Sequence, residues 1–205
     1  NMFLVKTACS NPAIAVTFCH NEQAAAIAAE GFYKVSRVPA VCLVTTGPGS
    51  TNAITGIVGA WLDSSSMIVL AGQVKIADKK PVGLRQKGPQ EIDFIAMIEG
   101  SCLESVEFVG PSRRDLIRVL DFLGFSPRKG PVVLSVPLDV QNSTREPIED
   151  TNQPSRFASG PTSFDFSSLL AELSNSSRPA ILFGEGCRDI STTLLKTLFD
   201  LCADH

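Results

Sequence analysis

Short apolar runs alternate with helix-favouring segments along the first 140 residues, and this order constrains the fold more than any other feature. Runs without polar alternation are typical of strands that are buried on both faces of a sheet. Strands that alternate with helices favour a parallel sheet with right-handed crossovers. We therefore predict an α/β fold, a mostly parallel sheet with helices on both faces. The predicted strands are 12–19, 38–46, 66–72, 102–109 and 130–137, and the predicted helices are 22–33, 52–62, 90–98 and 111–122.

The sequence changes character after residue 141. Residues 142–163 are rich in Ser, Thr, Asn, Glu and Pro and lack apolar periodicity, which predicts a linker. Beyond it we expect a helix at 165–173, a strand at 179–183 and a helix at 191–201. Because three elements cannot bury a core of their own, residues 164–205 are expected to be the start of a second α/β domain, cut off at its end.

Charge and composition narrow the function classes. The chain has 205 residues, of which 18 are Lys or Arg and 21 are Asp or Glu, so the net charge is −3. No run holds more than two basic residues, which argues against a nucleic-acid groove or an anionic membrane surface. No apolar run approaches the roughly 20 residues of a membrane helix, and the start lacks the pattern of a signal peptide. We expect a cytoplasmic protein without a metal site of its own, whose six cysteines, none in a C-x-x-C pair, are reduced and mostly buried.

Glu22 is the first candidate for chemistry, because it lies where a predicted strand turns into an alanine-rich helix. In open α/β sheets, ligands bind at the carboxyl ends of strands, where such loops lie. The plainer interpretation is a carboxylate that stabilises a helix start through the helix dipole, by a few tenths to about 1 kcal/mol.

Two further segments are candidates for ligand contact. The turn Gly47-Pro48-Gly49 follows a strand and precedes a helix, so its backbone can approach a ligand closely, although it could equally be only a tight turn. Gln90 follows a polar loop, and Gln86 is a nearby competitor for the same role. Arg85 and Lys87 belong to that loop. Their side chains could simply be solvated, or they could bind an anionic substrate.

These pieces occur in an order that resembles the pyrimidine-binding domain of thiamin diphosphate enzymes, and most resembles the acetolactate synthase group. The motifs that carry the resemblance are His20-Asn21-Glu22-Gln23-Ala24-Ala25, Thr46-Gly47-Pro48-Gly49-Ser50-Thr51-Asn52, Leu70-Ala71-Gly72-Gln73-Val74, Arg85-Gln86-Lys87-Gly88-Pro89-Gln90-Glu91 and the segment 130–141. The resemblance covers residues 12–141 almost continuously. It implies that residues 1–141 form this domain without its first strand, and that residues 164–205 begin the middle domain.

The resemblance also implies roles for single residues. Glu22 matches the glutamate that hydrogen-bonds the cofactor's aminopyrimidine and so activates the cofactor to its ylid. For this role we expect an apolar pocket that raises the pKa of the carboxyl. Gln90 matches a glutamine at the reacting centre. The residues that match the lining of the cofactor are Glu22, Thr46, Gly47, Pro48, Gly49 and Asn52.

The implied parent is a thiamin diphosphate- and Mg²⁺-dependent decarboxylase or carboligase, a lyase or transferase, that acts on a 2-keto acid such as pyruvate. The Gly-Asp-Gly motif that holds Mg²⁺ on the diphosphate is absent from the sequence, so we expect the chain alone to be inactive. FAD is bound by some acetolactate synthases, but the residues concerned are mostly missing here. The family assembles as homodimers or tetramers, which predicts exposed apolar surface around residues 24–29 and 54–62.

Two other interpretations remain. One is a non-catalytic module or half-site subunit, for which a partner chain supplies the diphosphate and metal site. The other is a dinucleotide-binding domain, suggested by Gly184-Glu185-Gly186 after a predicted strand. Its third glycine is missing, because Asp189 stands in that place.

Overall fold

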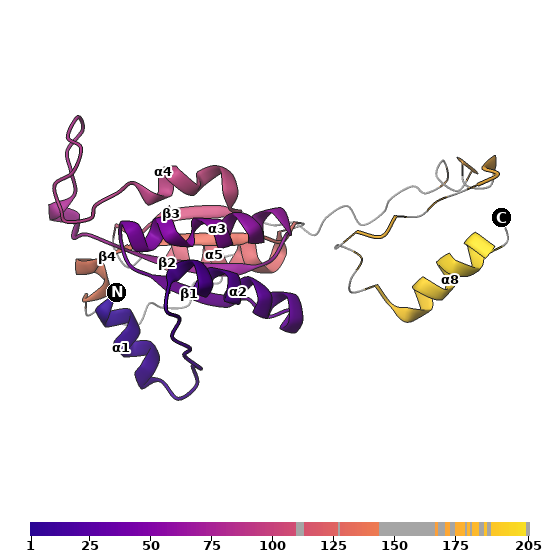
Figure 1. Cartoon of the computed structure of the whole chain (residues 1–205), viewed down its shortest axis with the longest axis horizontal. Coiled ribbons are helices and arrows are strands. Elements are labelled where there is room, and N and C mark those ends of the chain that lie inside the picture. Colours follow the sequence, from indigo (N-terminus) through magenta and orange to yellow (C-terminus); the bar gives the residue numbers. More distant parts are fainter. Residues whose placement is uncertain are drawn as a thin grey trace. The chain divides into compact units, whose positions relative to one another are not determined.

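The structure is a computed structural model, and it divides into two units, residues 1–158 and 159–205 (Figure 1). In the first unit it describes residues 1–109, 113–126 and 128–143. In the second unit it describes residues 167, 171–172, 175–178, 180, 182–184, 187 and 190–203.

A parallel four-stranded sheet forms the centre of the first unit. Its strands are β1 (Ala40–Val44), β2 (Met67–Gln73), β3 (Glu104–Glu107) and β4 (Pro131–Pro137). They lie in the order β1-β2-β4-β3, and every neighbouring pair is parallel. The predicted α/β class is therefore confirmed, as are four of the five strands predicted in residues 1–141.

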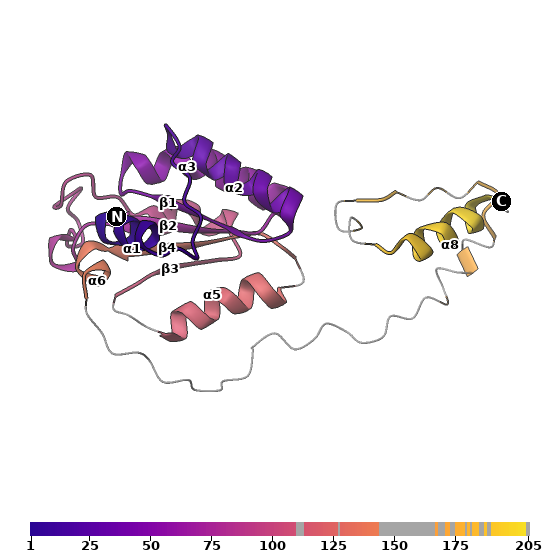
Figure 2. The same cartoon turned by 90° about the horizontal axis from the view of Figure 1, so that it is seen from below.

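Helices cover both faces of this sheet. Figure 2 shows α2 (Glu22–Ser36) and α3 (Pro48–Leu62) on one side and α5 (Arg113–Phe125) on the other. Alternate residues of one strand point to opposite faces. Thus Met67, Val69 and Ala71 of β2 pack in the cluster that includes α2 and α3, while Ile68 and Leu70 pack in the cluster that includes α5. Burial on both faces explains why the central strands β2 and β4 are largely continuous apolar runs.

Small residues allow α2 and α3 to pack closely. A Cβ added at Gly56 would lie 2.6 Å from Cβ of Ala26 and 2.9 Å from the Ala26 backbone carbon. Farther along, Lys34 pairs with Glu30 at 2.7 Å and with Asp63 just after α3. The contact therefore fixes the two helices along their length, including the N-terminal turns that carry the candidate site residues.

The prediction of a strand at 12–19 is wrong. This segment is exposed and adds no strand to the sheet, and Ile14, Val16 and Phe18 are exposed in it. Asn11 begins a turn instead: its carbonyl accepts from Ile14 N at 3.0 Å, and its side-chain oxygen accepts from Ala13 N at 3.0 Å. These local bonds replace the strand pairing that an apolar run requires in a sheet.

A helix that the sequence analysis missed, α1 (Met2–Ser10), precedes this segment. The side chain of Asn1 donates to the carbonyl of Val44, and that of Gln141 donates to Asn1 Oδ1 at 3.3 Å. These bonds place the start of α1 beside the end of β1 and the short helix α6 (Leu138–Gln141).

The predicted helices occur with altered bounds. Helix α3 begins at Pro48 rather than residue 52, because proline fits the first turn of a helix. The helix predicted at 90–98 is reduced to α4 (Phe94–Ile98), because residues 88–91 form a turn. Short 3-10 turns lie at η1 (Ile76–Asp78) and η2 (Glu99–Ser101).

The second unit is described in part. Helix α8 (Thr192–Ala203) confirms the helix predicted at 191–201. The strand predicted at 179–183 is not found at its described positions 180, 182 and 183. Most of the helix predicted at 165–173 and nearly all of the predicted linker lie outside the described residues, so the domain boundaries stay a prediction.

The prediction that the cysteines are mostly buried is wrong in part. Cys42 and Cys102 are buried free thiols, whereas Cys9 and Cys19 are exposed. Cys19 is exposed because its segment lies outside the sheet. Among the described residues, no helix is long and apolar enough to cross a membrane.

Candidate functional site

The N-terminal turns of α2 and α3 bring Glu22 and Asn52 together, although 30 positions separate them. Asn21 caps α2 through its side-chain oxygen, which accepts from Ala24 N at 2.7 Å. Glu22 is the first residue of the helix, so the helix dipole favours its negative charge. Asn52 Nδ2 donates to Glu22 Oε2 at 3.0 Å.

The state of the Glu22 carboxyl differs from the sequence-based expectation. The hydrogen bond from Asn52, followed by one from the backbone N–H of Glu22, holds its pKa below the ordinary value, against a smaller opposing effect of burial. Glu22 is only half-buried and Asn52 is exposed. The expected raised pKa is therefore wrong for this chain, because the carboxylate lies at a polar surface and not in an apolar pocket.

Two glycines at the start of α3 let this carboxylate and a neighbouring backbone segment lie close to the helix start. A Cβ at Gly49 would lie 3.3 Å from Glu22 Oε1 and 2.5 Å from Thr45 Cγ2. Gly47 has φ 66°, which is a left-handed conformation that favours glycine. Its missing Cβ would lie 2.5 Å from the backbone oxygen of Gln90. Only glycine at these two positions allows the Glu22 carboxylate and the Gln90 backbone to lie so close to the turn.

Thr46 connects the turn to two other elements. Its hydroxyl lies 3.2 Å from Gln73 Oε1 and 3.4 Å from the backbone oxygen of Gln90, and its single proton can be donated to either. Gln73, at the end of β2, is buried, and its Nε2 donates to the carbonyl of Ile92 at 2.8 Å. Gln73 was quoted in a motif but was not predicted as a site residue. The available signal was a polar side chain that ends an apolar strand.

The structure separates Gln90 from Gln86. The backbone of Gln90 lies against Gly47, while the amide of Gln86 donates to the Gly88 carbonyl within its own loop at 2.8 Å. Arg85 donates to Gln86 at 3.1 Å, and Lys87 donates to the carbonyl of Ala77. The loop that carries them projects from the fold between β2 and α4 (Figure 1).

The predicted site residues therefore gather at one place. Glu22 bonds to Asn52 and lies beside Gly49. Gln90 lies beside Gly47 and Thr46, and Pro48 joins the two glycines. Within the described part of the chain, no group of His, Cys, Asp and Glu side chains could hold a metal ion. The arrangement offers an ionised carboxylate that an amide donor holds at the surface, next to a turn whose two glycines are buried.

The chain matches a known family over its N-terminal part. Residues 1–97 match the family described as "Thiamine pyrophosphate enzyme, N-terminal TPP binding domain". Acetolactate synthase 2, chloroplastic, of Nicotiana tabacum is 30% identical over 184 residues, which are 85% of this chain and 26% of that protein. The acetolactate synthase large subunit of Lactococcus lactis is 34% identical over 175 residues, which are 81% of this chain and 29% of that protein.

The chain thus spans between a quarter and a third of the length of these relatives. Strands β1 and β2, the two adjoining helix starts and the glycine turn lie within the matched residues 1–97. Residues 1–97 of the chain thus match the N-terminal domain of thiamine pyrophosphate enzymes, and most of the chain is similar to acetolactate synthases.

Proposed function

We propose that this chain is the pyrimidine-binding part of a thiamin diphosphate- and Mg²⁺-dependent decarboxylase or carboligase that acts on a 2-keto acid such as pyruvate. Its reaction is a lyase or transferase reaction like that of acetolactate synthase. The observation that carries the proposal is the Glu22 carboxylate, oriented by Asn52 beside the Gly47–Gly49 turn. The names of the relatives support the substrate class.

The residues fit the aminopyrimidine of the cofactor. Without side chains at Gly47 and Gly49, the Gln90 backbone and the Glu22 carboxylate lie close to the turn, where the aminopyrimidine would contact them. Glu22 is charged at neutral pH and can accept a hydrogen bond from a ring nitrogen that carries a proton. When bound, thiamin diphosphate supplies the carbon nucleophile and the electron sink, which no protein side chain provides.

The chain's own residues would hold and orient the reacting groups. Oε2 of Glu22 is occupied by Asn52, so Oε1, which faces Gly49, is the oxygen that would hold the proton exchanged with the ring. Thr46 and Pro48 would complete the ring's surroundings, and Gln90 would reach toward the bound substrate. Mg²⁺ and the diphosphate would be held by another part of the parent, and the chain alone would be inactive.

The open site supports assembly of the parent as a homodimer or tetramer in which a second chain covers Glu22. Exposed apolar side chains occur in only part of the surface predicted for this contact. Ile27 and Leu62 are exposed, but Ala26 and Ile57 are buried between the helices. A cytoplasmic location remains part of the proposal, although the tobacco relative is named chloroplastic.

The test is Glu22→Gln in the full-length protein, with pyruvate consumption measured in the presence of thiamin diphosphate and Mg²⁺. Glutamine keeps a hydrogen bond but cannot exchange the proton, so we expect a loss of kcat of about 100-fold or more. Glu99→Gln, on an exposed carboxylate, is the control and should leave kcat unchanged. Turnover within a few-fold of the original protein after Glu22→Gln would exclude the catalytic role. Turnover that requires an added partner chain would favour the half-site subunit.

A further inference from the structure

Residues 88–91 form a turn that holds Gln90 in an unfavourable backbone conformation. The carbonyl of Gly88 accepts from the backbone N–H of Glu91 at 3.3 Å, with Pro89 in the second position of the turn. Gln90, in the third position, has φ 60°. A type II turn has this pattern and usually places glycine where Gln90 lies. A residue with a Cβ keeps this conformation only where its surroundings enforce it.

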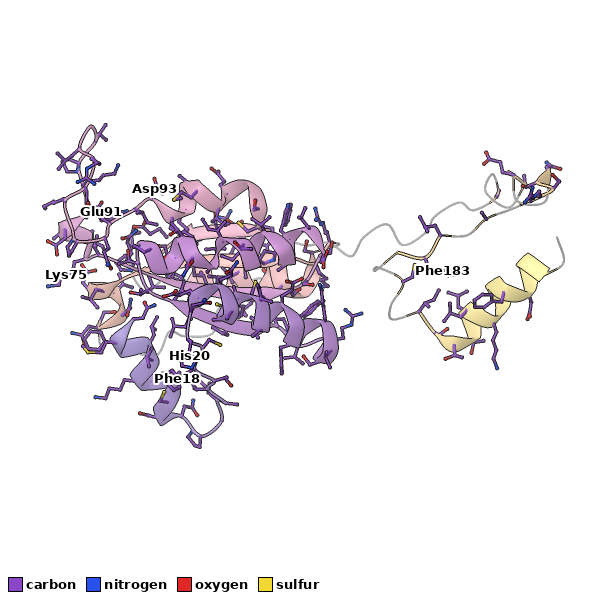
Figure 3. All side chains as sticks on the ribbon, in the orientation of Figure 1. Phe18, His20, Lys75, Glu91, Asp93 and Phe183 are labelled. Atoms are coloured by element: carbon purple, nitrogen blue, oxygen red, sulfur yellow. The ribbon has the colours of Figure 1, made fainter. Side chains whose placement is uncertain are left out.

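The carboxylate of Glu91 supplies such a restraint. Its Oε1 accepts from the backbone N–H of Lys80 at 2.6 Å. Its Oε2 accepts from the backbone N–H groups of Lys87 and Gly88 at 2.9 Å and 3.1 Å. Glu91 lies at the base of the projecting loop (Figure 3), so one side chain joins both ends of residues 80–88.

Glu91 is charged although it is buried, with an exposed fraction of 7%. Burial opposes the charge, but the three backbone hydrogen bonds together outweigh it and hold the pKa of this carboxyl below its ordinary value. Hydrogen bonds to a charged acceptor are about twice as strong as neutral ones. The turn is therefore held by charge-assisted bonds that an uncharged side chain cannot reproduce.

The turn is also packed on two sides. A Cβ at Gly88 would lie 2.8 Å from Val74 Cγ1, and a Cβ at Gly47 would lie 2.8 Å from Gln90 Cβ. A shift of the turn would thus move the Gln90 side chain relative to the glycine turn of the candidate site. No atom of Glu91 needs to reach that site for this effect.

We propose that Glu91 is a positioning residue, which fixes the left-handed conformation of Gln90 through three backbone N–H groups and so places the Gln90 side chain at the candidate active site. This inference rests on the proposed function. A misplacement of about 1 Å can lower a rate about 100-fold. The loss of Glu91 should therefore lower kcat without removing any group that touches the substrate.

The experiment uses Glu91→Gln, Gln90→Ala and the double variant in the full-length protein, with pyruvate turnover at saturating thiamin diphosphate and Mg²⁺. We expect Glu91→Gln to lower kcat at least about tenfold with KM changed less than about twofold. If Glu91 acts through Gln90, the double variant is no slower than Gln90→Ala alone. Additive losses would overturn the proposal.

Two controls separate positioning from general destabilisation. Glu104→Gln removes a carboxylate that binds Arg118 at 2.8 Å on β3, and it should leave kcat unchanged. Glu91→Asp keeps the charge on a shorter side chain, so it should fold if Glu91→Gln does not, with a smaller loss of kcat. Equal losses for Glu104→Gln and Glu91→Gln would also overturn the proposal.

Hydrogen–deuterium exchange gives a readout that does not depend on turnover. Glu91→Gln should speed exchange at the amides of Lys80, Lys87 and Gly88 and leave α3 unchanged, and unchanged exchange at all three would refute the restraint. If the unmodified protein fails to consume pyruvate, the proposed function falls. If the Glu91→Gln protein nevertheless shows faster amide exchange, Glu91 does hold the turn. Its role in placing a catalytic glutamine would then be rejected together with the proposed function.

Discussion

At the scale of single residues, the pair Glu22 and Asn52 determines what the site can do before any ligand arrives. Asn52 stabilises the charged form of the carboxyl, so the isolated chain presents an acceptor and not an acid. A carboxyl that must later hold a proton needs further burial to oppose this bond. This chain alone therefore orients Glu22. The proton affinity of Glu22 would be set only when another part of the protein covers the site.

We predict that Asn52→Ala raises the pKa of Glu22 toward its ordinary value, because the largest stabilising hydrogen bond of the carboxylate is lost. Carbon-detected NMR titration of the Glu22 carboxyl would measure this change. Asn142→Ala, at an exposed asparagine next to α6, is the control and should leave the titration unchanged. A Glu22 pKa that stays constant or falls in Asn52→Ala would contradict the assignment of Asn52.

The same bond gives a pH dependence whose sign follows from linkage. Since the folded-state pKa of Glu22 lies below its unfolded value, the stabilisation is present above the unfolded pKa and is lost as pH falls through the folded one. The free energy of unfolding of Asn52→Ala should therefore be lower than that of the original chain at pH 7. The two values should converge under acidic conditions.

Some site residues could be predicted from sequence because neighbouring residues define them. Glu22 follows Asn21 at a helix start, and the Gly47–Gly49 turn lies between an apolar strand and a helix. The bonds of Thr46 could not be predicted, since Gln73 and Gln90 lie 27 and 44 positions away. The exposure of the Glu22 carboxyl was missed for a related reason, because it depends on which distant parts of the chain cover the start of α2.

At the scale of elements, the contact between α2 and α3 is what holds the site residues together. Gly56 has no room for a side chain, because the backbone of Ala26 and Ile27 lies within 2.9 Å of an added Cβ. Neighbouring backbone cannot give way as a flexible side chain can. The closeness of the helices thus depends on glycine at this position.

We predict that Gly56→Ala destabilises the chain by about 1–3 kcal/mol through overpacking, despite the better helix propensity of alanine. Gly31→Ala is the matched control, since Gly31 lies in α2 with nothing within 4 Å of an added Cβ. It should stabilise the chain by about 0.5–1 kcal/mol. Urea unfolding of the three proteins measures both effects, and equal changes at the two glycines would contradict the packing argument.

The strands could be predicted where the apolar pattern of the sequence agrees with strand pairing in the sheet. The predictions of β1, β2, β3 and β4 are confirmed because each of these segments finds a parallel neighbour in the sheet. The run 12–19 has the same composition, but the turn at Asn11 and the absence of a paired neighbour leave it outside the sheet. Composition can show that a segment is suited to form a strand, but it cannot show that the segment pairs with the edge of the sheet.

At the scale of the whole molecule, the exposed apolar side chains of α2 indicate which face a second chain would cover. The exposed fractions of Phe32 and Val35 are 53% and 89%, and Ile27 on the same helix is exposed by 48%. Single exposed apolar residues are ordinary on protein surfaces, but three on one helix next to an open site are a candidate contact. This helix also carries Glu22, so the contact and the site would be completed together.

We predict that the double variant Phe32→Asp/Val35→Asp reduces the full-length protein to monomers, because burying two carboxylates at an apolar contact is strongly unfavourable. Sedimentation equilibrium would give the mass of each variant. Leu120→Asp is the control, since this leucine is also exposed, by 58%, but belongs to α5 on the opposite face of the sheet. It should leave the mass of the assembly unchanged. Two outcomes would exclude α2 as the contact: an unsubstituted protein that is already monomeric, or dissociation caused only by Leu120→Asp. Another surface would then have to cover Glu22.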